Sequence, residues 1–547
     1  MTSTAARLGA LDRVRTRLAT ARDLAAGRPR PVAIAAAIAA LAVLMGLSLM
    51  LRTQALLGGF WIDEGLSVGI ASHPLTDIPS VLRLDGSPPL YYMLLHVWMS
   101  IFGNGEGETH GMSVGFALLS IPAALWSGRS LGGPRAGWMA AIVASLHPFL
   151  TYYAQETRMY SLAVLLSMLA TTCFIHAYAL RDRRFIAPFA IFAALLIYTH
   201  NWGLFILMGT AAAFLLILWR TDDRGALLRD AALGYGGLAL LFAPWIPTLL
   251  FQSAHTGAPW SSAPDLEKLT SAAFTTLGGA RSGPLILVVG GAGAAALMGR
   301  PLRIRGADLS ELPGPDADRR RPAIQALVVT LVAALVVAWI ASQVAPAWTT
   351  RYFSVLVGPA IVFAGIGLAH ARGLGIAVLV ILVFVWWNDR AGELNTKSNV
   401  RSVTARVLLR PVAPGDLVVS THPEQIPVLR YYLGGGFRYA DPMGFVSDPQ
   451  VMDWRDALER LKAARPTPVA DRLVSSLKPG QALILVQPIL RAYYQWRAPW
   501  TKLVKRRAIQ WERVLQRDSR LRRVEALPRF GLTQPPRGVR VVLYRRR

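Results

Sequence analysis

Long apolar segments recur through the first 388 residues of the chain, and they constrain its fold more than any other feature. The first, residues 32–51, contains no charged residue and has the roughly 20-residue length that a helix needs to cross a bilayer. The chain is 53% hydrophobic and only 16% charged. It is thus more hydrophobic and less charged than a typical soluble domain, as expected of a protein with many membrane spans. The sequence predicts a polytopic α-helical membrane protein with about 11 spans, the other ten lying at 109–128, 136–151, 160–180, 185–199, 202–219, 228–250, 283–299, 323–343, 353–370 and 373–388.

Basic residues indicate how these spans are oriented. If the N-terminus is cytoplasmic, the inner segments before residue 389 hold 22 Lys and Arg residues, and the outer loops hold only 6. Cytoplasmic loops are enriched in basic residues, so we expect the N-terminus inside the cell. The same asymmetry argues against a span at Leu90–Phe102. This apolar stretch of 13 residues is expected to lie in the outer membrane interface instead.

The spans define a transmembrane domain at 31–388, whose first outer loop covers 52–108. Residues 1–30 are rich in arginine and lack a convincing signal-peptide cleavage site, so we expect a cytoplasmic arm that touches anionic lipid. Cys173 is the only cysteine and falls in a predicted span. The sequence therefore offers neither a disulfide framework nor a cysteine-based metal site.

Residues 389–547 alternate strand-like runs such as Leu417–Ser420 and Ala482–Val486 with helical stretches such as Trp454–Ala464. This pattern, broken by Pro-Gly turns, predicts a small α/β domain, which an odd number of spans places outside the cell. Its C-terminal end is very basic and the pI of the chain is near 11.0. Anionic lipid or cell-wall polymers suit such a domain better than nucleic acid, although a merely solvated basic tail explains the same residues.

Two adjacent carboxylates, Asp63 and Glu64, follow the first span. Acidic residues in an apolar, Trp-marked segment beside a membrane are costly, which favours a role for them on a lipid-borne substrate. Neighbouring residues of a helix point about 100° apart, so one carboxylate can face a cavity while the other takes a structural partner. An N-terminal cap for the helix, with Asp63 at the cap and Glu64 in the first turn, is compatible with that role.

A second acidic motif, Asp85-Gly86-Ser87-Pro88-Pro89, precedes the interfacial helix. Ser87 is expected to cap that helix, with Pro88 in its first turn. This capping arrangement does not involve Asp85, so it gives Asp85 no structural role. Asp85 can bind a substrate hydroxyl, or it can be a solvated turn residue.

The later outer loops add polar groups on the same face of the membrane. Glu156, Arg158 and Tyr160 lie in one loop and His200 in the next, where a surface ion pair and a satisfied polar histidine are the alternative interpretations. Arg351 and Tyr352 open the span at 353–370. A guanidinium there can bind phosphate through two hydrogen bonds, or it can simply extend toward lipid headgroups.

No Walker-type loop, GxSxG elbow or Rossmann glycine fingerprint preceding a helix occurs on the cytoplasmic side. The candidate chemistry collects on the outer face, where nucleotide sugars are absent. Group transfer on that face needs an activated donor that is carried by lipid.

Together these motifs resemble bacterial members of glycosyltransferase family 39, over about residues 30–370. That family has the C-type glycosyltransferase fold, which also includes protein O-mannosyltransferases and the aminoarabinose transferases of lipid A. The matching motifs, in order, are Trp61-Ile62-Asp63-Glu64, Asp85-Gly86-Ser87-Pro88-Pro89-Leu90-Tyr91-Tyr92 with Phe102-Gly103-Asn104, Arg158-Met159-Tyr160, Tyr198-Thr199-His200 and Arg351-Tyr352.

The resemblance implies an inverting transfer from a polyprenyl-phosphate sugar donor, with Asp63 as general base and no cofactor. Arg351, with Arg158, would stabilise the departing phosphate. The scheme requires no metal, although a carboxylate of the first loop with His200 could bind a divalent cation. The acceptor is a glycan, a lipid or a protein. The tail beyond 389 does not resemble that of protein O-mannosyltransferases, which weakens the case for a protein.

Two rival interpretations come from other functional classes. A non-enzymatic lipid or polysaccharide transporter predicts polar residues near the middle of the membrane and inverted repeats, and the sequence shows neither. A scaffold that presents the basic domain explains the tail but not the acidic residues.

Overall fold

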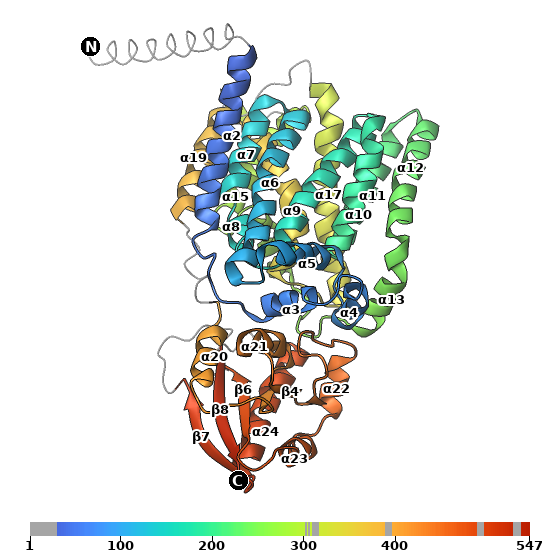
Figure 1. Ribbon diagram of the computed structural model, residues 1–547. Helices are drawn as coiled ribbons and strands as arrows, with labels where there is room; N and C mark the ends of the chain where they lie inside the picture. Colours follow the sequence, from blue (N-terminus) through green and yellow to red (C-terminus); the bar gives the residue numbers. More distant parts are fainter. Residues whose placement is uncertain are drawn as a thin grey trace, which may run out of the picture.

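The computed structural model describes residues 30–300, 303–304, 307–308, 317–388, 397–489, 497–528 and 538–547. The predicted basic arm at 1–30 lies outside the described residues except for Arg30, where α2 begins. Three layers follow one another along the molecule (Figure 1): a helical bundle, a thin layer of short helices, and a C-terminal α/β domain. The predicted fold class, a polytopic helical protein with a small α/β domain, is confirmed.

Each of the eleven expected apolar segments is helical in the structure. The long bundle helices are α2 (Arg30–Arg52), α6 (Glu106–Gly132), α9 (Tyr160–Phe174), α11 (Gly203–Arg220), α12 (Arg224–Phe242), α17 (Ala317–Val344) and α18 (Ser354–His370). With their short extensions, such as the π-helical turn after α9 and α13 (Ile246–His255) after α12, these form the seven described segments that are long and apolar enough to cross a membrane.

The other four segments are shorter helices: α7 (Pro134–Leu146), α10 (Ile186–Thr199), α15 to α16 (Gly283–Leu297) and α19 (Arg372–Asn388). The segment predicted at 136–151 is broken, because His147 leaves the helical conformation before Pro148, where α8 (Pro148–Tyr153) begins. Proline disfavours a helical residue before it, which explains the break.

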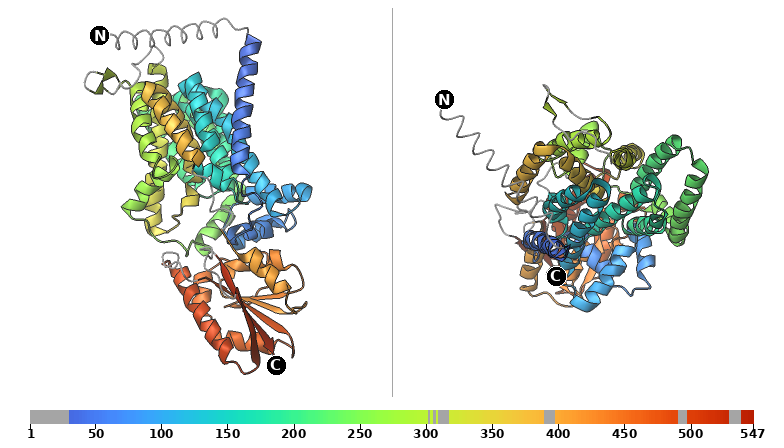
Figure 2. Two further views of the ribbon diagram at one scale, coloured as in Figure 1. Left: turned by 90° about the vertical axis from the view of Figure 1, so that its left-hand side faces the viewer. Right: turned by 90° about the horizontal axis from the view of Figure 1, so that it is seen from above.

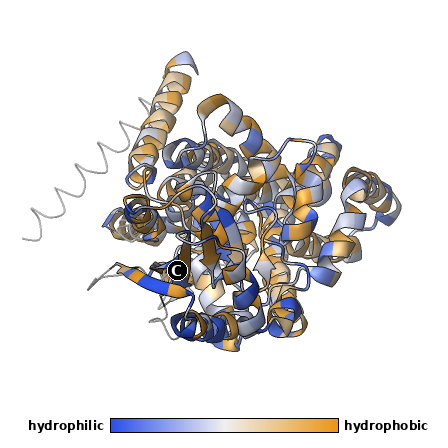
Figure 3. Ribbon diagram, turned by 60° about the horizontal axis from the view of Figure 1, so that its bottom comes forward, coloured by the Kyte–Doolittle hydropathy of each residue, from blue (hydrophilic) through white to orange (hydrophobic). Residues whose placement is uncertain are grey.

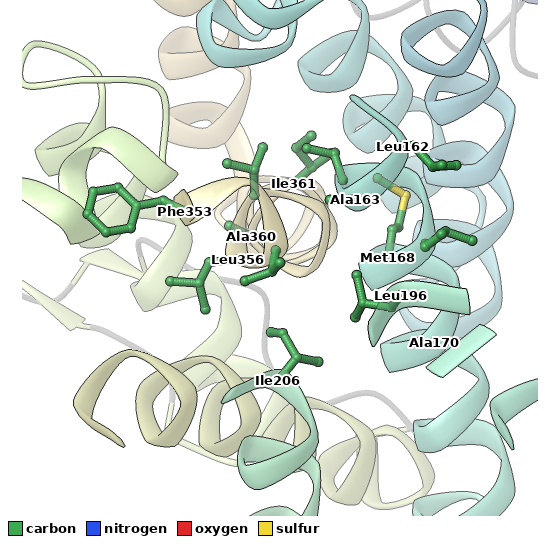
Figure 4. Packing of buried hydrophobic residues seen from close by; sticks show 14 of the residues in the cluster. Leu162, Ala163, Met168, Ala170, Leu196, Ile206, Phe353, Leu356, Ala360 and Ile361 are labelled. Carbon is green, nitrogen blue, oxygen red and sulfur yellow. The ribbon is translucent and has the colours of Figure 1, made fainter. Parts of the chain in front are cut away.

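The centre of the bundle is formed by α18, which is buried along nearly its whole length. It packs against α7 and α9, and Figure 4 shows Leu356, Ala360 and Ile361 of α18 among side chains of α9, α10 and α11. In contrast, α2 stands at the edge of the bundle (Figure 2) and exposes most of its apolar side chains. It is coloured as hydrophobic along most of its length in Figure 3, as expected of a helix that faces lipid.

The layer below the bundle contains α3 (Ile62–Ala71), α4 (Ile78–Asp85) and α5 (Leu90–Phe102). The bounds of α5 agree with the predicted interfacial helix, and it lies across the end of the bundle in Figure 1. The predicted cap at Ser87 is wrong, because Pro89 occupies the cap position. The preceding turn is made by Gly86, whose φ of 94° is one that glycine adopts readily.

The C-terminal domain is built on a six-stranded sheet with the order β5-β4-β3-β6-β8-β7. The central strands β4, β3 and β6 run parallel, and β8 is antiparallel to both β6 and β7. The strands are β3 (Leu417–Ser420), β4 (Arg438–Asp441), β5 (Gly444–Phe445), β6 (Ala482–Pro488), β7 (Leu521–Leu527) and β8 (Val539–Arg546).

Helices cover both faces of this sheet, which explains why β3 and β6 are buried at every residue. One apolar core lies against α20 (Val400–Leu408) and α21 (Ile426–Leu433). The other lies against α23 (Pro466–Ser475) and α24 (Pro499–Arg517). The helix expected at Trp454–Ala464 is α22, which covers Ala457–Ala463.

The C-terminal domain docks directly on α3. A methyl group added to Gly65 would collide with Val428 of α21, and one added to Gly69 would collide with the carbonyl oxygen of Gln450. Two glycines one helical turn apart therefore let the two backbones approach closely. The first residues of α2 and the C-terminal domain lie at opposite ends of the bundle (Figure 1), as an odd number of crossings requires.

Candidate active site

The adjacent carboxylates of α3 point to different surroundings. The helix begins after Trp61, which occupies the cap position, so Asp63 and Glu64 both lie in its first turn. The predicted cap at Asp63 is therefore wrong by two residues. The side chain of Asp63 is 16% exposed, whereas that of Glu64 is fully buried.

Glu64 is held by partners from three separate parts of the chain. His110 Nε2 lies 2.5 Å from Glu64 Oε1, and the backbone N–H of Thr157 donates to the same oxygen at 2.9 Å. Lys397 Nζ lies 2.7 Å from Oε2. Burial by itself raises the pKa of Glu64, but the contacts with Lys397 and His110 outweigh burial and lower it to about 2. Glu64 is thus an ionised group that joins α3, α6 and the start of the C-terminal domain.

Asp63 faces an arginine, Arg351, whose side chain is 19% exposed. Asp63 Oδ2 lies 3.5 Å from Arg351 Nη2, at the long end of hydrogen-bond distances. Within the described residues, Asp63 Oδ2 is buried without a hydrogen-bond partner, and so is Arg351 Nε. Buried polar atoms are nearly always paired, so these two atoms are available to hydrogen-bond to a ligand.

The second arginine, Arg158, is turned toward the start of α3. Its Nη1 donates to the backbone carbonyl of Asp63 at 3.3 Å, to Ser67 Oγ at 3.0 Å and to the Tyr92 hydroxyl at 3.3 Å. The side chain is nearly buried, so these bonds fix its orientation. Arg158 and Arg351 are close enough to affect each other electrostatically.

Asp85 ends α4 on the same side of the site. Burial raises the pKa of Asp85, and a hydrogen bond from Ser87 together with the charge of Arg158 opposes that rise. The carboxylate of Asp63 is also close enough to contribute to the increase. The site therefore holds two carboxyl groups in different electrostatic surroundings, the arrangement that lets such groups take different chemical roles.

Aromatic rings close the other side of the cluster. The ring of His200 lies 4.8 Å from that of Tyr352 and 6.1 Å from that of Tyr160, centre to centre. Arg158 lies over the Tyr160 ring and Arg351 over the rings of Tyr352 and Trp61. Burial, followed by the two arginines, lowers the pKa of His200 to about 3, so this imidazole is neutral at physiological pH.

The described residues contain no group of three or more His, Cys, Asp or Glu side chains arranged to hold a metal ion. His200 Nδ1 accepts a hydrogen bond from the backbone of Trp202 at 3.1 Å, so this nitrogen is already engaged. The suggested carboxylate and histidine pair for a divalent cation stays a prediction.

The structure brings together seven of the eight residues that are assigned to the catalytic and substrate-binding site from the sequence. Glu64 is the exception, because it turns away to its own buried partners. The seven residues around the cluster are Asp63, Asp85, Arg158, Tyr160, His200, Arg351 and Tyr352.

Sequence reasoning missed the supports of Glu64, above all Lys397 and His110. A signal was present, since a carboxylate in an apolar segment needs a cation nearby. The sequence gives no means of choosing among the available cations. Arg158 and Arg351 beside Asp63 form a site that can hold an anionic group next to a carboxylate able to accept a proton.

Neither a scan of protein families nor a search of curated proteins finds a match to this sequence. Solved structures do match. ArnT from Cupriavidus metallidurans in the apo state has a TM-score of 0.62 at 13% identity, covering 93% of this chain and 98% of that chain. The same protein bound to undecaprenyl phosphate gives a TM-score of 0.58 at 13% identity, with coverages of 94% and 98%.

Two further structures are similar over most of this chain. The oligosaccharyltransferase AglB from Archaeoglobus fulgidus, in complex with an inhibitory peptide and a dolichol-phosphate, has a TM-score of 0.53 at 12% identity and covers 82% of this chain and 69% of that chain. The arabinofuranosyltransferase AftD from Mycobacteria has a TM-score of 0.51 at 16% identity, with coverages of 92% and 39%. The chain therefore has the C-type glycosyltransferase fold, and the resemblance seen in its motifs is confirmed at the level of fold.

Proposed function

We propose that this chain is a membrane glycosyltransferase that moves a sugar from a polyprenyl-phosphate carrier to an acceptor hydroxyl, on the outer face of the cytoplasmic membrane. The observation that carries the proposal is the partly buried ion pair of Asp63 and Arg351, in which Asp63 Oδ2 and Arg351 Nε each lack a hydrogen-bond partner among the described residues. A base beside a cation that binds phosphate is what such a transfer needs.

Similar solved structures support the choice of donor. ArnT has been solved with undecaprenyl phosphate and AglB with a dolichol-phosphate. Both ligands are phosphates on long polyprenyl chains. A donor of this class would place its chain along the apolar bundle and its phosphate at Arg158 and Arg351, where the bundle meets the layer of short helices.

In the proposed reaction, Asp63 removes the proton of the acceptor hydroxyl as that oxygen attacks the anomeric carbon. The bond between the anomeric carbon and the phosphate oxygen breaks on the opposite face, so the configuration inverts. The electron pair leaves with the polyprenyl phosphate. Arg351 and Arg158 stabilise the charge that grows on this leaving group, and their burial strengthens that effect.

The remaining residues of the cluster receive supporting roles. Asp85, buried near Arg158, would bind a hydroxyl of the sugar. Tyr160, Tyr352 and the neutral His200 would form the wall against which the sugar ring packs. Glu64 holds α3 in place and does not touch the substrate.

The proposed orientation rests on the excess of basic residues in the inner segments. It places the N-terminus in the cytoplasm, and the site with the C-terminal domain outside. Anionic lipid or a cell-envelope polymer then faces the basic domain.

A transporter remains the alternative from another class. The polar cluster argues against it, because Asp63 and Asp85 belong to α3 and α4. These helices lie in the layer at one end of the bundle (Figure 1) and not along a path through its middle. A transporter would move an intact lipid-linked sugar and release no polyprenyl phosphate.

The proposal is tested with the full chain in nanodiscs and a panel of synthetic polyprenyl-phosphate sugars. Release of free polyprenyl phosphate with a matching glycosylated product supports the transferase. Mass spectrometry of lipid-linked sugars that accumulate in a deletion strain would identify the donor for the assay. Intact donor under all conditions in nanodiscs, with lipid-linked sugar crossing the bilayer of sealed proteoliposomes that contain the same chain, would contradict the proposal.

A further inference from the structure

A cavity of about 570 Å³ lies between α3 and the C-terminal domain. The glycine face of α3 forms one wall, and α21 and the loop before α22 form the other. The residues that matter are Gly65 and Gly69 of α3, Asn104 before α6, Arg430 and Tyr431 of α21, and Gln450.

The cavity lies on the far side of α3 from the candidate active site. Residues of a helix are about 100° apart, so Gly65, two residues after Asp63, points nearly the opposite way. A helix is roughly 10 Å thick, which separates the cavity from the reacting carboxylate by about that distance. The cavity cannot hold the hydroxyl that reacts, but it can hold a more distant part of the same acceptor.

Two polar side chains in the cavity have unused hydrogen-bonding groups. Arg430 and Gln450 are half-buried, and neither side chain makes a hydrogen bond or ion pair with another described residue. By contrast, Arg401 on the rim donates to Leu57 O at 3.1 Å and lies 3.5 Å from Glu106. Among the described cavity residues of the C-terminal domain, free donors and acceptors are therefore found on α21 and on the loop before α22, and not on α20.

An aromatic ring lies beside these groups. Tyr431 packs on Phe60 and on Tyr432, with ring centres 4.9 Å apart in both cases, and its hydroxyl donates to Asn104 O at 3.1 Å. The ring is thus held rigidly. A fixed aromatic ring next to planar guanidinium and amide groups suits a sugar, which offers an apolar ring face and hydroxyls at its edge.

The other ligand classes fit less well. A lipid chain needs an apolar lining, whereas this cavity is lined largely by polar groups. A free anion would find the cation of Arg430, but it would also meet the carboxylate of Glu106, which lines the cavity beside Arg401. The volume is within the range of small-ligand pockets and exceeds what one water cluster needs.

We infer that this cavity is an acceptor subsite that binds one or more sugar units of a glycan chain, remote from the unit that is modified. The inference rests on the proposed transferase function and deepens it, because it selects a glycan as the acceptor. In this arrangement an acceptor must be long enough to reach from the cavity at the C-terminal domain to Asp63. Helix α3 lies between the end of the acceptor that is bound in the cavity and the end that reacts.

The test uses purified full chain in nanodiscs on an array of immobilised hexose and pentose oligosaccharides of one to six units. We expect the wild type to retain a subset of the longer oligosaccharides. The Arg430→Ala/Gln450→Ala variant should bind them at least about tenfold more weakly. The matched control is Arg406→Ala, an exposed arginine of the same domain outside the cavity, which should bind like the wild type. Equal retention by the cavity variant, or retention of no array member by the wild type, overturns the inference.

A retained oligosaccharide then serves as acceptor in the transfer assay. The cavity variant should raise the KM for this acceptor about tenfold and leave the KM for the donor unchanged. Because binding and transfer are measured separately, a failure of the proposed function and a failure of the cavity inference give different results. Oligosaccharide binding that depends on Arg430 without any transfer supports the cavity and contradicts the proposed function. Transfer with an unchanged acceptor KM in the variant supports the function and overturns the cavity.

Discussion

Lys397 Nζ lies 2.7 Å from Glu64 Oε2, with both side chains buried. Lys397 also donates to Gln155 O at 3.3 Å, so the start of the C-terminal domain is tied to two outer segments of the transmembrane domain. Because Glu64 directly follows Asp63, this ion pair fixes the part of α3 that carries the candidate base. The C-terminal domain therefore takes part in building the site.

The first prediction concerns this pair. Lys397→Met removes the cation and leaves Glu64 buried with His110 as its main remaining partner, so we expect a loss of about 3–5 kcal/mol in stability. Thermal unfolding of the purified protein measures the loss. Glu64→Gln in the same chain should recover part of it, and strictly additive effects of the two substitutions would show that the pair is not coupled.

The second prediction concerns the close approach of α3 to the C-terminal domain. Gly69→Ala places a methyl group against the backbone of Gln450 and should lower the melting temperature, because backbone must move. The matched control is Gly115→Ala, since an added methyl group at this helical glycine of α6 meets nothing within 4 Å. That control should be neutral or slightly stabilising. Equal melting temperatures for both variants would contradict the tight docking.

The third prediction is a loss of stability in acid. The pKa values of Glu64 and His200 are lowered in the folded protein, to about 2 and about 3. Between these values and their ordinary ones, the unfolded chain binds more protons than the folded chain, so stability falls as pH decreases. For His200 the loss begins below about pH 6.5, and for Glu64 below about pH 4.3. Denaturation curves recorded at several pH values give the free energy of unfolding at each pH. Between about pH 6.5 and 4.5, this free energy should fall less steeply with decreasing pH for His200→Asn than for the wild type. The same dependence of the unfolding free energy on pH in both proteins would show that His200 does not contribute to the loss of stability in acid.

The fourth prediction separates phosphate binding from membrane anchoring at Arg351. A lysine keeps the charge but replaces a planar fork with a single ammonium group. If Arg351 binds the donor phosphate, both Arg351→Lys and Arg351→Ala should lose turnover while remaining folded, and the loss should be greatest at limiting donor. If Arg351 only reaches toward headgroups, the lysine variant should work normally. Kinetics of both variants at saturating and limiting donor decide between the two.

Much of the fold could be predicted because it follows from local patterns. The apolar runs located all eleven helical segments of the bundle, and the interfacial helix at Leu90–Phe102 was predicted with its observed bounds. The strand at Leu417–Ser420 was also predicted as observed. Local signals failed at helix ends. Ser87 is a good capping residue, but the helix starts later, because the Pro-Pro sequence delays it until Leu90.

The site was predictable only in part. The outer-rim residues could be found because polar groups beside a membrane are costly and stand out. Helix geometry predicted that one of Asp63 and Glu64 faces the site and the other has structural partners. It did not predict which residues are the partners of Glu64. Lys397 and His110 reach Glu64 from distant parts of the chain, and nothing local in the sequence distinguishes them from other basic residues.

Asp63→Asn tests the central claim most directly. The amide is nearly the same size as the carboxylate, but it cannot accept the proton of the acceptor hydroxyl. With purified donor and acceptor, turnover should fall about 10²- to 10⁴-fold while melting temperature and membrane insertion stay unchanged. Asp77→Asn, at an exposed aspartate of the same loop, is the matched control and should keep full turnover. Near-normal turnover by the Asp63 variant would contradict the assignment of Asp63 as the general base.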